Sequence, residues 1–202
     1  KQELANKTLQ SELKFLKSQI NPHFLFNTLN SLYALTLKKS DLAPEIVLKL
    51  SEMMRYMLYE CNEKLVPLDK EINYIINYLE LEKIRHGKKI DIQFQQTGEI
   101  SNQKIAPLLF IPFIENCFKH GVSHQLNEAY VKIHIDVNGD EVSGTIENSK
   151  QAVMPGQPLK KSGGIGLINV RRRLDLLYFG AYKLKVEDSP NTYKVKLELK
   201  LI

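Results

Sequence analysis

The first third of the chain repeats apolar residues with the period of an α-helix. One stripe follows positions spaced four, three and four apart: Leu9, Leu13, Leu16 and Ile20. Asn21-Pro22 then interrupts the stripe, because proline lacks a backbone donor and crowds the preceding turn, so we expect a kink or a restart here. Beyond the proline, an apolar face resumes at Leu25, Leu29 and Leu32.

A second helix follows a break at 39–41. It is predicted to start near Pro44 and to turn these side chains inward: Ile46, Leu50, Met53, Met54 and either Met57 or Leu58. Two helices joined by a short loop form an antiparallel hairpin. A lone hairpin cannot bury its apolar stripe, so we expect it to pair with a second copy.

The pattern changes at Val66-Pro67-Leu68. We predict a helix at 69–86, capped by Asp69 and stopped by Gly87, and then a strand at 90–94 and a buried helix at 107–120. A β-hairpin of 130–137 with 141–147 follows, and then a mobile loop at 150–164. The last predicted elements are a helix at 166–179 and a β-hairpin of 182–187 with 192–201. Strands and helices mixed in this way predict an α+β sandwich with its helices on one face. The predicted domains are therefore a helical hairpin at 1–65 and an α/β sandwich at 66–202.

Composition and charge narrow the class of protein. Of 202 residues, 43% are hydrophobic and 25% charged, which is typical of a soluble globular domain. The longest nearly apolar stretch, 105–114, contains two prolines and is too short to cross a bilayer. The net charge of +5 is spread along the chain among acidic residues, so we expect no direct nucleic-acid role. Cys61 and Cys117 have no metal-like spacing and are interpreted as structural thiols of a reducing compartment.

The polar side of the first helix carries the first candidate chemistry. Its residues are spaced four, four and three apart: Gln19, His23, Asn27 and Asn30. His23 alone could be an ordinary surface histidine. Placed just after the proline and flanked by uncharged amides, its ring is instead a good candidate phosphoryl acceptor.

Two further segments could bind a phosphorylated ligand. The predicted helix at 107–120 ends in a polar group formed by Glu115, Asn116, Lys119 and His120, which could be a solvated helix end or could hold Mg²⁺ and phosphate. Gly163-Gly164-Ile165-Gly166 stands directly before a helix, where exposed backbone N–H groups and the helix dipole favour phosphate. It is not a Walker A loop, because no Gly-Lys-Ser/Thr follows.

Together these segments resemble the sensor histidine kinases of the LytS/YehU type. The run QINPHFLFNTLNSL is similar to the phosphoacceptor motif of that family, and the segments around 107–121 and 163–174 are similar to the N-box and G-box of its GHKL-type ATPase domain. Arg55-Tyr56 and the helix end YLELEKIR, residues 78–85, extend the resemblance, which covers about residue 15 to the C-terminus.

The resemblance implies a role for each matching residue. It implies a dimerisation and phosphotransfer hairpin that bears His23, followed by a GHKL (Bergerat) ATP-binding sandwich. Asn116 would bind Mg²⁺, Glu115, Lys119 and His120 would line the same phosphate-facing helix, and Gly164 and Gly166 would close a lid over the phosphates. Leu167, Asn169 and Arg173 match the rest of the G-box.

Two positions depart from related kinases. Asn148 stands where an aspartate usually accepts a hydrogen bond from the adenine amino group, and the glycine that usually follows is missing, although Glu147 is adjacent. Phe24 follows the acceptor histidine, where many other histidine kinases have an acid, which leaves Glu115 as the candidate general base.

The expected function is that of a homodimeric protein-histidine kinase. It would use Mg·ATP to phosphorylate His23 and pass the phosphoryl group to an aspartate of a response regulator, which the resemblance suggests is of the LytTR type. Because the chain opens with Lys1 and not with Met, we expect it to be part of a longer protein. The resemblance implies that it is the cytoplasmic part of a bacterial inner-membrane protein, anchored through a region N-terminal to it. Asn148 and Lys150 leave open a nucleotide-degenerate scaffold, and a GHKL ATPase that drives a conformational change is a further alternative.

Overall fold

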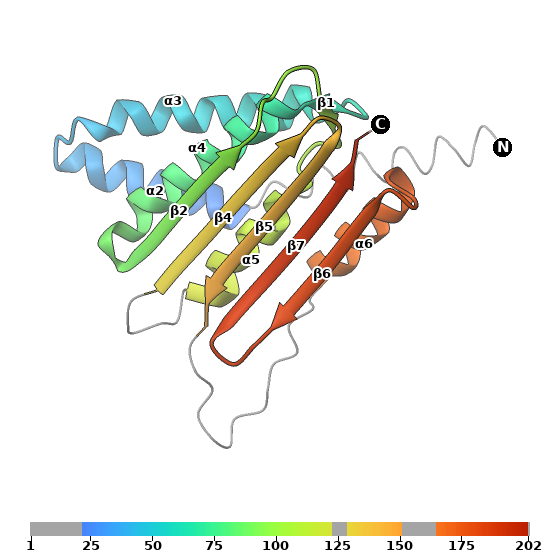
Figure 1. The fold of residues 1–202 in the computed structure, drawn as a ribbon. Coiled ribbons are helices and arrows are strands. Elements are labelled where there is room, and N and C mark those ends of the chain that lie inside the picture. The colour runs from blue at the N-terminus through green and yellow to red at the C-terminus, as the bar shows by residue number, and fades with distance from the viewer. Residues whose placement is uncertain (1–21, 123–128, 151–164, 202) are drawn as a thin grey trace.

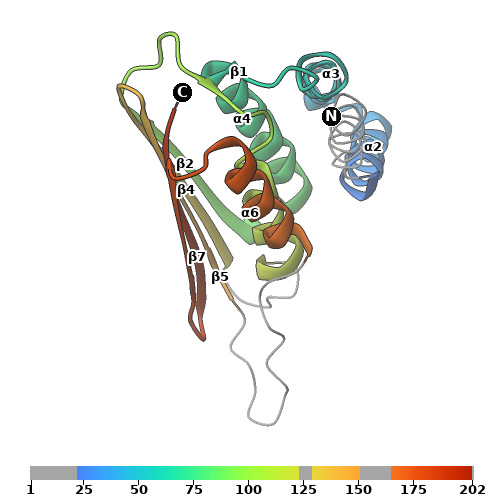
Figure 2. The same ribbon diagram turned by 90° about the vertical axis from the view of Figure 1, so that its right-hand side faces the viewer.

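The chain folds into three layers, formed by a helical hairpin, a set of central helices and a β-sheet (Figures 1 and 2). The computed structural model describes residues 22–122, 129–150 and 165–201. The stripe before Pro22 and the predicted loop at 150–164 therefore lie, apart from Lys150, outside the described residues. The α+β class expected from the sequence is confirmed.

The sheet contains five strands in the order β2 (Ile90–Thr97), β4 (Ala129–Asn138), β5 (Glu141–Ser149), β7 (Thr192–Lys200) and β6 (Tyr182–Asp188). β2 runs parallel to β4, whereas the other neighbours are antiparallel. Two short strands, β1 (Val66–Pro67) and β3 (Lys104–Ile105), form a separate antiparallel pair. The two predicted β-hairpins, β4 with β5 and β6 with β7, are confirmed.

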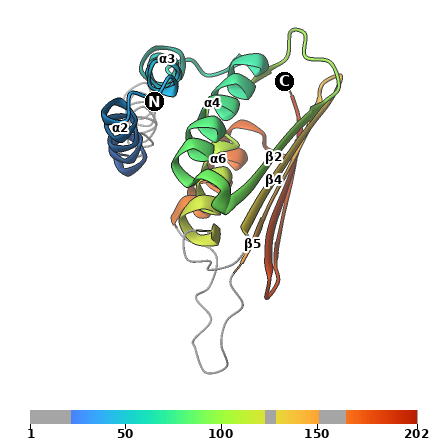
Figure 3. The ribbon, with the colours of Figure 1, turned by 90° about the vertical axis from the view of Figure 1, so that its left-hand side faces the viewer.

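In the described part of the chain, helices cover one face of this sheet (Figure 3). They are α4 (Leu68–His86), which ends in the short 3₁₀ turn η2 (Gly87–Lys89), α5 (Ile111–Asn116), which continues into the π-helical turn η3 (Cys117–Val122), and α6 (Ile165–Leu177). Along β4, Val131, Ile133 and Ile135 are buried, whereas Lys132 and His134 are exposed. This alternation leaves the other face of the sheet to solvent.

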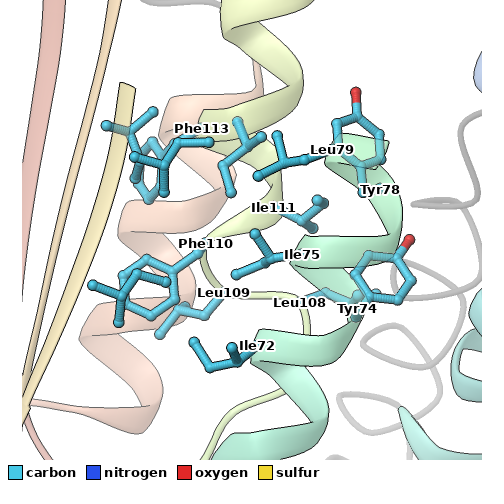
Figure 4. Close-up of a cluster of buried hydrophobic side chains, with 14 of the residues drawn as sticks. Ile72, Tyr74, Ile75, Tyr78, Leu79, Leu108, Leu109, Phe110, Ile111 and Phe113 are labelled. Carbon is cyan, nitrogen blue, oxygen red and sulfur yellow. The ribbon is translucent and has the colours of Figure 1, made fainter. Parts of the chain in front are cut away.

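The core lies between the sheet and these helices (Figure 4). Phe110 and Phe113 point towards the strands, while the Ile75 side chain lies between α4 and α5. All three side chains are at most 2% exposed. Tyr74 and Tyr78 lie on the other face of α4, turned away from the sheet.

The hairpin covers that outer face of α4. It consists of α2 (Pro22–Leu37) and α3 (Leu42–Arg55), and α3 ends in the π-helical turn η1 (Tyr56–Glu60). Ile46, Leu50 and Met53 of α3 are buried, as predicted. Of the two alternatives at the end of this stripe, Met57 packs against the core and Leu58 is 44% exposed. Met54 is 37% exposed, so its predicted inward orientation is wrong within this chain.

Three other details differ from the sequence predictions. Helix α4 begins at Leu68 after Pro67, so Asp69 lies in its first turn and is not its cap. Helix α5 begins at Ile111 and not at residue 107, because Leu108 has a left-handed backbone with φ of 54°. On α2, Phe24 is buried and Leu29 is 43% exposed, since the face that meets α4 is rotated from the predicted leucine stripe.

No helix within the described parts of the chain is both long enough and apolar enough to cross a membrane.

Two glycines with left-handed backbones give a matched stability test. Gly98 has φ of 79°, and a Cβ built there would lie 1.8 Å from the Val137 carbonyl oxygen, whereas Gly139 has φ of 59° and open space around it. We expect Gly139→Ala to lower the free energy of unfolding by about 1 kcal/mol through backbone strain alone. Gly98→Ala should cost about 2–3 kcal/mol, because steric overlap adds to the strain. Urea unfolding of both variants measures the difference, and equal losses would contradict the predicted overlap.

Candidate functional site

His23 lies at the start of α2 with its side chain exposed to solvent. One turn later, Asn27 Nδ2 lies 3.2 Å from both ring nitrogens, Nδ1 and Nε2, so an amide N–H can donate to whichever nitrogen lacks a proton. Thr28 Oγ1 donates to the Phe24 carbonyl at 2.9 Å and is buried against the domain. The polar side of α2 that carries His23 therefore faces outward, while Phe24 anchors the helix.

A chain of aromatic contacts connects this helix to the N-box. The Phe24 ring stacks on Tyr78 of α4, with 4.7 Å between the ring centroids. Tyr78 in turn meets Phe118 of η3 edge to face at 5.9 Å. Aromatic pairs of this kind are favourable beyond the area that they bury. The residue next to His23 thus packs, through one intervening ring, against the turn that follows Asn116.

The predicted N-box residues lie at the end of α5 and in η3. Glu115 and Asn116 are half-buried, and Lys119 is exposed. The Glu115 carboxylate lies close enough to α4 to contribute to the raised pKa of Tyr74 and Tyr78, although burial of the two rings is the larger cause. His120 lies in the same turn, and its side chain is outside the described set.

Asn148 ends the buried face of β5. Its side chain is 2% exposed, and Nδ2 donates to the Ser149 carbonyl at 2.7 Å, which orients the amide. The neighbouring Glu147 points to the other face of the sheet, where it accepts from the Tyr130 hydroxyl at 2.8 Å. Lys150 pairs with Asp188 at the end of β6. Of these positions, only Asn148 faces the helical layer.

The G-box residues lie along α6. Ile165 and Gly166 open the helix, Leu167 and Asn169 in the next turn are half-buried, and Gly164 falls outside the described residues. Arg173 lies farther along the helix, and its positive charge opposes the burial that raises the pKa of the Glu71 carboxyl. The guanidinium is therefore close to α4, on the inner side of α6.

The fold brings the N-box, the end of β5 and the start of α6 to one end of the molecule. The turn η3 packs against β4 and β5, and α5 packs against α6. Figure 2 shows the first turn of α6 beside the end of η3, at the same end as the last residues of β5. This end of the molecule thus combines the neutral amide of Asn116, the cationic side chain of Lys119 and the positive end of a helix.

This set of donors fits a magnesium–nucleotide complex. No group of three His, Cys, Asp or Glu side chains in the described part of the chain could hold a metal ion alone. Mg²⁺ commonly takes one or two protein oxygens and completes its shell with phosphate oxygens and water. Asn116 is suited to that minimal role.

The sequence predictions did not include two buried carboxylates on α4. Glu71 and Glu82 are each 1% exposed, and with Ile75 and Tyr78 they follow a spacing of four, three and four along one buried stripe. The sequence does contain a signal for them, because an acid stands at each end of this apolar stripe. Buried acids almost always have partners, so each carboxylate is expected to have one. Glu82 Oε2 lies 2.6 Å from Arg85 Nη2 and 3.2 Å from His86 Nε2.

The two cysteines are buried and unpaired with each other. Burial is the main cause that raises the pKa of Cys61 and of Cys117 to about 12. Because the thiolate is the reactive form, we expect iodoacetamide at pH 8 to react with both about a thousandfold more slowly in the native than in the unfolded protein. Mass spectrometry with and without denaturant measures this ratio, and rapid labelling of the native protein would contradict the burial.

The chain was compared with known proteins. A family model described as histidine kinase matches residues 11–90. Sensor histidine kinase BtsS of Escherichia coli K12 is 33% identical over 91% of this chain, and sensor protein LytS of Bacillus anthracis is 29% identical over 94% of it. Sensor histidine kinase YpdA of Escherichia coli K12 is 31% identical over 87% of the chain.

The chain spans about a third of these relatives, with 32% of BtsS, 34% of LytS and 32% of YpdA covered. Among solved structures, the catalytic domain of histidine kinase ThkA is similar at a TM-score of 0.49 and 17% identity, over 67% of this chain and 93% of that domain. That likeness is too distant to bear on function. The sequence matches cover both the hairpin and the sandwich, and so the chain belongs, over the part of their length that it spans, to the sensor histidine kinases of the LytS, BtsS and YpdA type.

Proposed function

We propose that this chain binds Mg·ATP at the N-box and G-box and transfers the γ-phosphoryl group to His23. The observation that carries the proposal is the aromatic contact from Phe24 through Tyr78 to Phe118, which joins the acceptor helix to the N-box turn. Phosphoryl transfer requires mainly positioning and charge neutralisation. A packed connection between the acceptor and the phosphate-facing turn supplies the positioning.

Each proposed site residue has one task. Asn116 holds Mg²⁺ through its side-chain oxygen, and Mg²⁺ neutralises charge on the phosphates. Lys119 and His120, on the same turn, would meet the negative charge of the phosphates, while Gly164 and Gly166 would offer backbone N–H groups. Leu167, Asn169 and Asn148 line the nucleotide.

Two of the proposed roles are more specific. We propose that Arg173 supports the nucleotide site indirectly, since its charge acts on the buried Glu71 carboxyl. Asn148 offers its side-chain oxygen to the adenine amino group without the charge of an aspartate.

The chemical step forms a bond between an unprotonated nitrogen of His23 and the γ-phosphorus, and breaks the bond from that phosphorus to the bridging oxygen of ADP. The other ring nitrogen carries a proton, which a base accepts as the phosphohistidine becomes neutral at the ring. Glu115 is the proposed base, and Asn27 orients the ring. The phosphoryl group then passes to an aspartate of a response regulator, for which we propose the LytTR type.

A second copy of the chain completes the hairpin. Large apolar side chains stay exposed on the outer faces of α2 and α3, among them Phe26, Tyr33 and Leu37 on α2 and Val47 and Leu48 on α3, each at least 48% exposed. Such a patch is typical of an interface. We propose a homodimer in which this patch of one hairpin packs on that of its partner, and a parent protein that is anchored in a bacterial inner membrane.

Incubation with labelled Mg·ATP tests the proposal. We expect acid-labile phosphate on the wild type and none on His23→Gln, since that variant removes only the acceptor nitrogens. His134→Gln is the matched control, because His134 is an exposed histidine on the far face of the sheet, and it should label like the wild type.

The other outcomes separate the rival functions. Label that persists on His23→Gln would disprove the assignment of the acceptor. Absence of both label and Mg·ATP binding in the wild type would favour the nucleotide-degenerate scaffold. ATP hydrolysis that does not depend on His23 would favour a GHKL ATPase that drives a conformational change.

A further inference from the structure

Glu71 is a buried carboxylate that connects three parts of the chain. It lies on α4 and is 1% exposed. Its Oε1 accepts a hydrogen bond from the Tyr56 hydroxyl and a second one from the Leu108 backbone N–H, at 2.6 Å for the latter. Burying a carboxylate is costly unless donors satisfy it, so these two bonds are strong constraints on both partners.

The two donors, Tyr56 and Leu108, belong to different parts of the fold. Tyr56 is the first residue of η1, where the hairpin ends, and its ring also contacts Tyr74 with 5.2 Å between centroids. Leu108 lies in the segment that leads into α5 and therefore to Asn116. A single carboxylate oxygen thus touches both the exit of the hairpin and the approach to the N-box.

The segment around Leu108 needs to be held in place. Leu108 has φ of 54°, a left-handed conformation that costs free energy for any residue except glycine. Two residues earlier, the Ala106 N–H donates to the hydroxyl of Tyr178, just beyond α6, at 2.8 Å. The turn before α5 is therefore fixed by a side chain of α4 on one side and by one beyond α6 on the other.

On the hairpin side, this contact starts from a π-helical turn. In η1 the hydrogen-bond pattern of α3 changes, and the Cys61 N–H donates to the Tyr56 carbonyl at 3.0 Å. Turns of this kind are frequent at functional sites. A rotation of α3 would move the Tyr56 hydroxyl relative to Glu71 without unfolding either helix.

We propose that Tyr56 and Glu71 are positioning residues that couple the exit of the hairpin to the N-box helix, so that the hairpin sets how well the chain binds Mg·ATP. This inference rests on the proposed function. It adds a route by which the arrangement of the hairpin reaches Asn116: the Tyr56 hydroxyl fixes Glu71, Glu71 fixes the left-handed turn at Leu108, and that turn sets where α5 begins.

Tyr56→Phe tests the coupling, because it removes one hydroxyl and keeps the ring. We expect the KM for Mg·ATP in His23 labelling to rise about fivefold, at the low end of couplings between protein sites, with a smaller change in kcat. Tyr59→Phe is the matched control, since Tyr59 belongs to the same turn but is 73% exposed, and its KM should equal that of the wild type. If Tyr56 only stabilised the fold, Tyr56→Phe would lower the melting temperature and leave the KM unchanged.

Hydrogen exchange gives a second and independent readout. Because coupling is reciprocal, Mg·ATP should slow amide exchange at residues 56–61 of the wild type. If Tyr56→Phe does not fold, this measurement decides alone: slower exchange supports the coupling, and unchanged exchange overturns it.

The outcomes separate the two proposals. Wild type that labels His23 beside a folded Tyr56→Phe variant with an unchanged KM overturns the coupling and leaves the proposed function intact. Wild type that neither labels His23 nor binds Mg·ATP overturns the proposed function itself.

Discussion

Replacing Phe110 by alanine is expected to lower the free energy of unfolding by about 3–5 kcal/mol, which is the usual cost of deleting a buried aromatic side chain. Phe110 is fully buried and precedes α5, where its ring lies against β5. A Cβ built on Gly144 would lie only 2.4 Å from Phe110 Cε1, so the ring rests directly on the backbone of that strand. Urea unfolding monitored by circular dichroism measures the loss.

The same contact predicts a compensation. In the wild type, Gly144→Ala should cost about 1–3 kcal/mol, because the new methyl group overlaps a ring that has no room to move. In the Phe110→Ala background the same methyl group should be neutral or stabilising, since it enters the space that the ring has left. Additive losses in the double variant would show that the two residues do not touch.

Phe179→Ala is the matched control for Phe110→Ala. Phe179 is 88% exposed just beyond α6, so the same substitution there should change the free energy of unfolding by less than about 0.5 kcal/mol. A comparable loss at both positions would contradict the description of the core.

Replacing Asn116 by alanine is expected to reduce the rate of His23 labelling by about a hundredfold or more, the usual cost of removing one preorganised group where charge develops. The proposed reason is the loss of an oxygen ligand to Mg²⁺. Asn116 is half-buried, so the free energy of unfolding should change little. Labelling rates measured over a range of Mg²⁺ concentrations, beside a thermal melt, separate the two effects.

Two variants serve as controls for Asn116→Ala. Asn116→Asp keeps an oxygen at the same position and should retain more activity than alanine does. Asn102→Ala makes the same change in an exposed loop near β3 and should label at the wild-type rate. Labelling by Asn116→Ala at the wild-type rate would exclude Asn116 as the metal ligand.

The period of the apolar positions and the residue types at the turns predicted most of the helices and strands. The alternation along 130–137 and 141–147 around Asn138-Gly139 predicted the central hairpin, because a left-handed glycine turn leaves few other conformations to the chain. The second β-hairpin, predicted at 182–187 with 192–201, corresponds to β6 and β7. The period of the apolar residues does not say which element packs against each face of a helix, and the inward orientation predicted for Met54 is therefore wrong.

The candidate site was predictable only in part. The motif order assigned residues to the N-box and G-box, and this assignment stays a prediction. The fold brings η3 and the start of α6 to one end of the sheet. The electrostatic effect of Arg173 on Glu71 was not predictable, because the two residues lie on helices far apart in the sequence. The left-handed backbone at Leu108 was equally hidden, since leucine gives no local signal for it.

The parallel pairing of β2 with β4 has a consequence for how the protein is made. Ile90 lies opposite Ala129, and the chain between them, which includes α5 and η3, is the crossover connection that joins the two parallel strands. The N-box therefore lies in the connection between two strands that are far apart in the sequence. Pairing of such strands is slow, because the intervening chain must first be ordered. During synthesis, the hairpin with His23 leaves the ribosome well before β4 is available. The helix that carries the proposed acceptor is thus complete early, while the surface that would phosphorylate it must wait for the sheet to close.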